Sequence, residues 1–244
     1  MVEKHDTHSS LLTNHFLLKV TAIIGLLAAL TAAITVAGKY YGDRLAMDGQ
    51  TEIQAPVRIA IGQDILSLPA NMIRFENQRR NGRADSVSLY AAWPELEGYT
   101  RAKAALFSAP GGSRNLIFME FTQSVMSRDM SGRLEPIYRR LFTGTPEKGP
   151  AGLSINRLSE KSGFGPEVIL TAKQPDGRDY VVRCILPATA EAATSADCQR
   201  DIHVGRDLTF LYRFSSQLLP EWQELDAALG RFAVDHVKTN QIQK

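Results

Sequence analysis

Histidines are the side chains of this sequence best suited to acid–base or metal chemistry, but most of them have no suitable partner residues nearby in the sequence. Three of the five lie near the N-terminus, where they could bind a metal weakly: His5, His8 and His15. His203 lies close in sequence to Asp201 and Asp207, which could form half of a metal or acid–base site. No further ligand follows at a suitable spacing. A surface histidine is the simpler interpretation of His203, and chance explains the N-terminal group.

Carboxylates offer one further arrangement. Glu95 and Glu97 would share a face if their segment were a strand, which makes a glycosidase-like acid pair conceivable. The flanking Pro94 and Gly98 favour a turn instead. The sequence also has no nucleophile elbow, Ser-x-x-Lys motif, phosphate-binding glycine loop or dinucleotide fingerprint. We therefore assign no catalytic, cofactor-binding or metal-binding residue.

Arginines are concentrated between positions 74 and 83. This stretch contains four arginines, Arg74, Arg79, Arg80 and Arg83, and only one acidic residue, Glu76. Guanidinium groups match the geometry of carboxylates and phosphates, so this cluster could contact an anion, a lipid headgroup or a partner protein. A solvated loop is the alternative.

The chain has two cysteines, Cys184 and Cys198, separated by fourteen positions. An isolated pair at this spacing is typical of a disulfide in an oxidising compartment. Closing a loop of that length stabilises a fold by about 3 kcal/mol in the chain-entropy model. The alternative is two unrelated buried thiols.

One segment favours a membrane location. Residues 20–38 contain no charge and would span roughly 28 Å as a helix, close to the hydrocarbon thickness of a bilayer. Tyr40 and Tyr41 follow directly, where aromatic rings favour the headgroup region. We predict a transmembrane helix over 19–39. The alternative is a cleaved signal peptide, but the apolar stretch exceeds the usual length of a signal core.

The charges around that helix leave its orientation undecided, because Lys4 and Lys19 on one side balance Lys39 and Arg44 on the other. The cysteine pair and the lack of glycosylation sequons favour a bacterial inner-membrane protein. The predicted organisation is a cytoplasmic tail (1–18), the helix (19–39), a juxtamembrane linker (40–50) and a periplasmic domain (51–244). A net charge of only +2 gives no sign of nucleic-acid binding.

Alternating or continuous apolar residues predict most of the elements that would position these side chains. The expected strands are 57–61, 87–93, 116–121, 168–172, 180–186 and 208–214. Pro69 makes 65–75 an edge strand or an extended connection. The Asp176-Gly177 pair predicts a hairpin between two strands, and 187–206 is expected to be a loop.

Two helices are expected. The first covers 134–142, with Pro136 in its first turn and Gly144 at its end. The second begins near Pro220 and buries an amphipathic seam of apolar residues that ends at His236. The fold class is therefore α+β: one N-terminal transmembrane helix, then a mostly antiparallel β domain with a few packed helices, including the C-terminal one.

Four segments together resemble bacterial single-span, periplasm-facing proteins with no assigned activity: the anchor, Leu68–Arg74, Trp93–Gly98 and Leu219–Trp222. The resemblance implies a membrane-anchored domain and no particular site residue.

Three functional hypotheses follow. The first is a non-enzymatic envelope protein that binds or assembles with another envelope protein. The alternative is a periplasmic hydrolase or small-ligand-binding domain with a dispersed site that includes Glu95, Glu97 or His203. The third is self-association through the small residues of the anchor: Gly25, Ala29, Ala32 and Ala33. No cofactor is expected, and the oligomeric state stays open.

Overall fold

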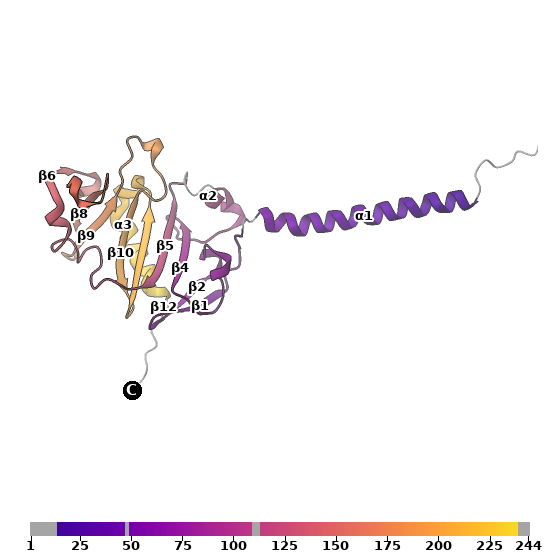
Figure 1. Ribbon diagram of the computed structural model, residues 1–244, viewed down its shortest axis with the longest axis horizontal. Helices are drawn as coiled ribbons and strands as arrows, with labels where there is room; N and C mark the ends of the chain where they lie inside the picture. The colour runs from indigo at the N-terminus through magenta and orange to yellow at the C-terminus, as the bar shows by residue number, and fades with distance from the viewer. Residues whose placement is uncertain (1–13, 47–48, 109–112, 239–244) are drawn as a thin grey trace, which may run out of the picture. The chain divides into compact units, whose positions relative to one another are not determined.

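The computed structural model describes residues 14–46, 49–108 and 113–238 (Figure 1). The expected features at 1–13, including His5 and His8, lie outside these ranges, as does most of the predicted cytoplasmic tail. The chain divides into two units, 1–49 and 50–244.

The first unit contains one helix, α1 (Asn14–Ala46). Its segment Leu17–Val36 has a mean hydropathy of 2.2, and the described helix is long and apolar enough to cross a membrane. A signal sequence would satisfy the same criteria. The helix also continues through residues 40–46, which the sequence assigned to a linker.

The second unit is built on an eight-stranded antiparallel sheet (Figure 1). In spatial order its strands are β4 (Ser86–Ala92), β5 (Leu116–Gln123), β11 (Leu208–Phe214), β10 (Cys198–Val204), β9 (Asp179–Cys184), β8 (Val168–Lys173), β7 (Ser154–Leu158) and β6 (Phe142–Lys148). A smaller sheet has the order β12 (Val237–Lys238), β2 (Asp64–Pro69), β1 (Pro56–Ile61) and β3 (Gly82–Arg83).

Two α-helices complete this unit, α2 (Ala104–Ser108) and α3 (Trp222–His236). Short 3-10 helices occupy Ala70–Met72, Glu76–Gln78, Arg101–Lys103, Tyr138–Leu141, Pro150–Gly152, Glu160–Ser162, Ala190–Ala192 and Ser216–Glu221. The α+β class and the C-terminal amphipathic helix are confirmed.

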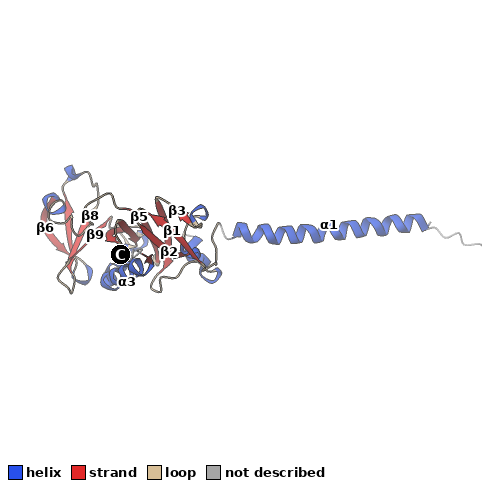
Figure 2. Cartoon of the chain, turned by 90° about the horizontal axis from the view of Figure 1, so that it is seen from below, coloured by secondary structure: helices blue, strands red, loops and turns tan. Residues whose placement is uncertain are grey.

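The main core lies between the inner face of the large sheet, the seam of α3 and the small sheet (Figure 2). Leu225 and Leu229 of the seam are fully buried. Trp222 stacks on Tyr180 of β9 with ring centroids 4.3 Å apart, and Phe232 lies 6.2 Å from Phe210 of β11. Burying several large apolar side chains, at about 1.5–3 kcal/mol each, fixes the helix on the sheet.

Buried Asp64 joins the small sheet to the β10–β11 hairpin. Its carboxylate accepts hydrogen bonds from the backbone amides of Arg206 and Asp207, at 2.8 and 3.0 Å. A side chain at Gly205 would approach that carboxylate to within 2.8 Å, so the close contact requires glycine there.

The helix predicted over 134–142 is wrong. Residues 134–137 form irregular turns, Tyr138–Leu141 form a short 3-10 helix, and β6 begins at Phe142. Leu134 and Tyr138 are buried against Ile169 and Val181, so packing on the sheet satisfies the apolar pattern without an α-helix. Gly144 lies within β6 rather than at a helix end.

Two further expectations are corrected. The segment 187–206 contains β10 as well as a loop, because Cys198 and the alternating residues after it pair with β11. The stretch after Ile65 is not an edge strand: β2 ends at Pro69 and lies between β1 and β12. Proline is tolerated because it is the last residue of the strand. The hairpin at Asp176-Gly177 is confirmed.

Candidate functional site

The most distinctive feature of the large sheet is the divergence of β9 from β10. These strands pair only at Cys184 with Cys198 and at Arg183 with Gln199. The predicted disulfide is present at this vertex and joins Cys184 to Cys198, with their Cα atoms 4.0 Å apart. Beyond the vertex the strands separate, and we call the space between them the wedge.

Arg200 of β10 bridges the wedge. Its Nη1 donates to the backbone oxygen of Val181 on β9 and to the Ser131 hydroxyl, both at 2.8 Å. Its Nε lies 2.9 Å from the carboxylate of Asp226 on α3. The residue is only 4% exposed, so these bonds compensate for burying a charge.

Asp226 holds the centre of this network. Besides Arg200, it accepts hydrogen bonds from the Tyr212 hydroxyl and, at 2.6 Å, from the amide of Gln174. Burial alone would lower the pKa of Arg200, but Tyr212, Asp226 and Tyr180 raise it above its ordinary value. Burial, assisted by Asp226, also raises the pKa of the Tyr212 hydroxyl. The raised pKa values keep the proton on Arg200 and on the Tyr212 hydroxyl, which suits a rigid scaffold better than proton transfer.

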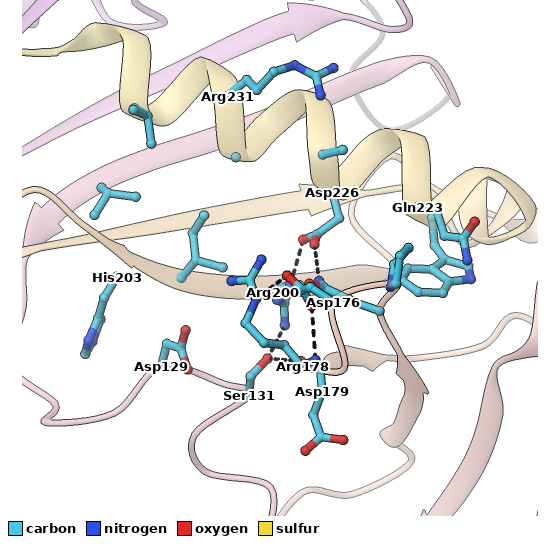
Figure 3. Close-up of a pocket in the computed structure, with 18 of the residues that line it drawn as sticks. Asp129, Ser131, Asp176, Arg178, Asp179, Arg200, His203, Gln223, Asp226 and Arg231 are labelled. Atoms are coloured by element: carbon cyan, nitrogen blue, oxygen red, sulfur yellow. Dashed lines mark hydrogen bonds and ion pairs between the residues drawn. The ribbon is translucent and has the colours of Figure 1, made fainter.

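A groove of about 920 Å³ opens above this network, between α3, β10, the β8–β9 hairpin and the loop at 129–132 (Figure 3). Apolar or small residues line much of it: Ile202, Val204, Trp222, Ala227, Gly230 and Val234. Val234 is 65% exposed, and a side chain built at Gly230 would meet nothing within 4 Å. The groove is therefore an open, preformed concave surface of the kind that binds ligands or partners.

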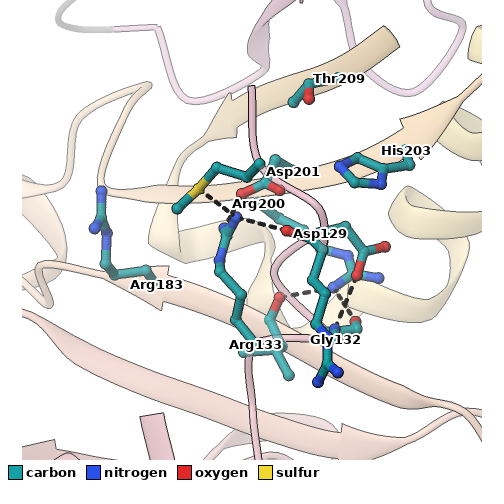
Figure 4. Close-up of polar contacts among 12 residues, drawn as sticks. Asp129, Gly132, Arg133, Arg183, Arg200, Asp201, His203 and Thr209 are labelled. Atoms are coloured by element: carbon teal, nitrogen blue, oxygen red, sulfur yellow. Dashed lines mark hydrogen bonds and ion pairs between the residues drawn. The ribbon is translucent and has the colours of Figure 1, made fainter. Parts of the chain in front are cut away.

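His203 also lines the groove, but it is exposed. Its Nε2 lies 3.1 Å from the Ser124 hydroxyl, which also bonds the backbone oxygen of Met126. Asp201 does not orient the histidine, because it forms an ion pair with Arg133 (Figure 4). Among the described residues, the serine–histidine contact lacks the carboxylate that would complete a nucleophilic triad.

Glu95 and Glu97 are not brought into this groove. Both are exposed and share Lys103, whose Nζ lies 3.6 Å from Glu95 and 2.8 Å from Glu97. The three residues of the dispersed-site hypothesis therefore do not line one pocket. In addition, the described part of the chain holds no cluster of three or more His, Cys, Asp or Glu suited to a metal ion.

The predicted arginine cluster is only partly available for a partner. Arg79 supports its own loop, because its Nε donates to the backbone oxygen of Ile73 at 2.9 Å. Arg80 and Arg83 are exposed. Arg74 lies over the ring of Phe118, 5.0 Å from its centroid.

A small second pocket of about 90 Å³ lies beside Arg74, on the face of the large sheet that carries Phe118. Arg213 and Glu120 line it as well, and the mixed charges weaken any preference for an anion.

Sequence reasoning missed Arg200 and Asp226. Arg200 occupies an inward position in the alternation of β10, and Asp226 follows directly after a buried leucine in the α3 seam. An arginine at an inward position of a strand and an aspartate beside the buried seam of a helix together are a signal for a buried ion pair. It was hidden because β10 was not recognised as a strand.

Comparison with known proteins assigns no family. No family model and no curated protein matches the chain. One similar solved structure is Smlt3025, an immunity protein of the Stenotrophomonas maltophilia type IV secretion system: 14% identity, TM-score 0.49, with 76% of this chain and 94% of that chain covered. Another is the Neisseria meningitidis iron-regulated outer membrane lipoprotein FrpD: 12% identity, TM-score 0.44, with coverage of 75% and 95%. Likenesses at this level carry no argument about function.

Proposed function

We propose that this chain is a single-pass protein of the bacterial inner membrane whose periplasmic domain binds another envelope protein in the groove and performs no catalysis. The groove is the observation that carries the proposal: it is large, preformed and bordered by exposed Val234, while the charged groups at its floor are bonded to one another.

The proposed localisation rests on two features. The apolar segment Leu17–Val36 supports an anchor, and the disulfide supports an oxidising compartment for the domain. In a bacterium these two features together favour the periplasmic side of the inner membrane. The N-terminus would then face the cytoplasm.

The groove can be tested by photo-cross-linking in intact cells with the full-length protein. A benzophenone amino acid replaces Val234 in the groove or, as a control, the exposed Glu160. We expect a discrete adduct with another envelope protein from position 234 and none from position 160.

Occupying the groove should remove that adduct. Gly230→Trp places an indole in the open space, whereas Gly230→Ala leaves the groove open and is the matched control. Adducts that persist with tryptophan, or that form equally at position 160, would contradict the proposal. The double variant Arg80→Glu/Arg83→Glu tests whether the arginine cluster adds a second contact, since charge reversal should then reduce the adduct.

A further inference from the structure

One edge of β10 stays without a neighbouring strand inside the wedge. The pairing of β10 with β9 stops at Gln199, whereas its pairing with β11 continues to Val204. Ile202, His203 and Val204 all line the groove. The edge of the strand is therefore open to the groove over these last residues.

The backbone alternation shows which groups face the wedge. The backbone oxygen of Asp201 accepts a hydrogen bond from the amide of Met130, so the backbone N–H and C=O of Asp201 point away from β11 and into the wedge. Successive residues of a strand point their N–H and C=O groups to opposite sides. The N–H and C=O of His203, two residues further on, therefore point into the wedge as well.

The backbone oxygens beside His203 in the wedge already have partners, including that of Asp201. On β9, the oxygen of Val181 accepts from Arg200, and that of Asp179 accepts from the Ser131 hydroxyl at 2.7 Å. Within the described chain, no partner from outside the β10–β11 pair bonds the backbone of His203. This residue presents a donor and an acceptor side by side, the pair that an added strand uses.

The walls of the groove indicate the side chains that such a strand would carry. Ala227 and Gly230 leave room on α3 for an apolar side chain next to Ile202. Three acids line the opposite wall: Asp129, Asp176 and Asp179 (Figure 3). Asp176 forms an ion pair with Arg178, and Asp179 forms one with Lys173, whereas no described residue forms an ion pair with Asp129. Asp129 therefore favours a basic side chain at that wall.

We propose that the occupant of the groove is an extended segment of a partner protein, which adds to β10 as a strand at His203. It places an apolar side chain against Ala227 and Gly230 and a basic one toward Asp129. This inference rests on the proposed function, since it names the form in which the partner enters the same groove.

The first test selects peptides from a displayed library of random sequences on the full-length protein in detergent. Peptides that also bind Gly230→Trp are removed. We expect the remaining sequences to contain a basic residue next to an apolar position, and to bind Asp129→Asn more weakly. The asparagine keeps the acceptor for the Gly132 amide and removes only the charge. A library without groove-dependent binders would overturn the inference.

The second test addresses strand addition itself. Methylating single peptide amides should weaken binding about tenfold at the amide that faces His203 and little at its neighbours, because only alternate amides bond the strand. His203→Pro should weaken binding similarly by removing the wedge-facing N–H, whereas His203→Ala keeps it. Melting temperatures of both variants establish that they are folded.

Hydrogen exchange separates this inference from the proposed function. Bound peptide should slow exchange of the His203 amide. Groove-dependent peptides that leave this exchange unchanged and tolerate His203→Pro would disprove strand addition but leave the groove as a binding site. If the protein with an unblocked groove gives no cellular adduct from position 234, the proposed function itself is removed.

Discussion

At the residue scale, Arg200 and Asp226 determine the shape of the groove floor. Arg200 connects β10 to β9 and α3 through bonds of 2.8–2.9 Å, and Asp226 receives three donors. A buried ion pair adds little net stability compared with apolar packing, but removing one partner leaves the other charge buried without compensation.

We therefore expect Asp226→Ala to lower the free energy of unfolding by about 3–5 kcal/mol. Asp235→Ala is the matched control, because Asp235 lies on the same helix and is exposed. Denaturant unfolding followed by tryptophan fluorescence measures both, since Trp93 and Trp222 are the two tryptophans of the chain and lie in the domain. Equal effects of the two substitutions would show that the network is not structural.

Asp197 should make stability depend on pH. Burial alone would raise its pKa, but hydrogen bonds from Thr194 and Ser216 lower it below the ordinary value of 3.8. A carboxyl group with a depressed pKa stabilises the fold above its unfolded pKa and loses that contribution as the pH falls. We expect the stability advantage over Asp197→Asn to be full near pH 6 and to shrink as the pH falls below about 4. Unfolding curves across this range measure it, and a constant difference would contradict the assignment.

At the element scale, α3 combines a buried seam with an open stripe of small residues. The seam explains why the helix packs on the sheet, and Ala227 and Gly230 explain why a groove stays beside it. Glycine is unfavourable inside a helix because it loses more backbone conformational entropy on folding than any other residue.

Gly230→Ala should therefore raise the free energy of unfolding by about 0.5–1 kcal/mol, since a Cβ there meets nothing within 4 Å. Gly205→Ala is the contrasting variant: its Cβ would collide with Asp64, and the backbone has a φ of +64°. We expect that substitution to destabilise the domain. Chemical denaturation compares the two, and destabilisation by Gly230→Ala would show that the groove is more crowded than described.

At the scale of the whole molecule, the two units differ in what surrounds their apolar side chains. The side chains of Leu17–Val36 in α1 are almost all exposed within their own unit, and this helix is long and apolar enough to cross a membrane. The domain has its own apolar core on both sides of the large sheet, together with a covalent cross-link.

We expect the intact chain to stay in the membrane fraction after alkaline washing, with residues 1–38 present by mass spectrometry. The variant Leu27→Arg should be released, because a charge at the middle of the span costs about 2.5–3.5 kcal/mol on insertion scales. A mature protein that begins after Gly38 would instead establish a cleaved signal peptide.

Much of this architecture could be predicted from local sequence. The apolar run of α1, the alternation in β1, β4 and β11, the Asp-Gly hairpin and the spacing of the α3 seam all reflect short-range periodicity, which is written in consecutive residues. The cysteine spacing likewise predicted the disulfide. Sequence reasoning failed at 134–142, where a helical pattern of apolar residues was buried by contacts with distant β8 and β9.

The groove could not be predicted from local sequence, because its residues come together only in the tertiary structure. Arg200 and Asp226 are 26 positions apart, and Ser131 is 69 positions from Arg200, so no local pattern connects them. The divergence of β9 from β10 depends on which strands pair and where pairing stops, and pairing is a non-local choice. The sequence by itself therefore determined an apolar helix of membrane-spanning length, an α+β domain and a disulfide, whereas only the packing of distant segments created the groove.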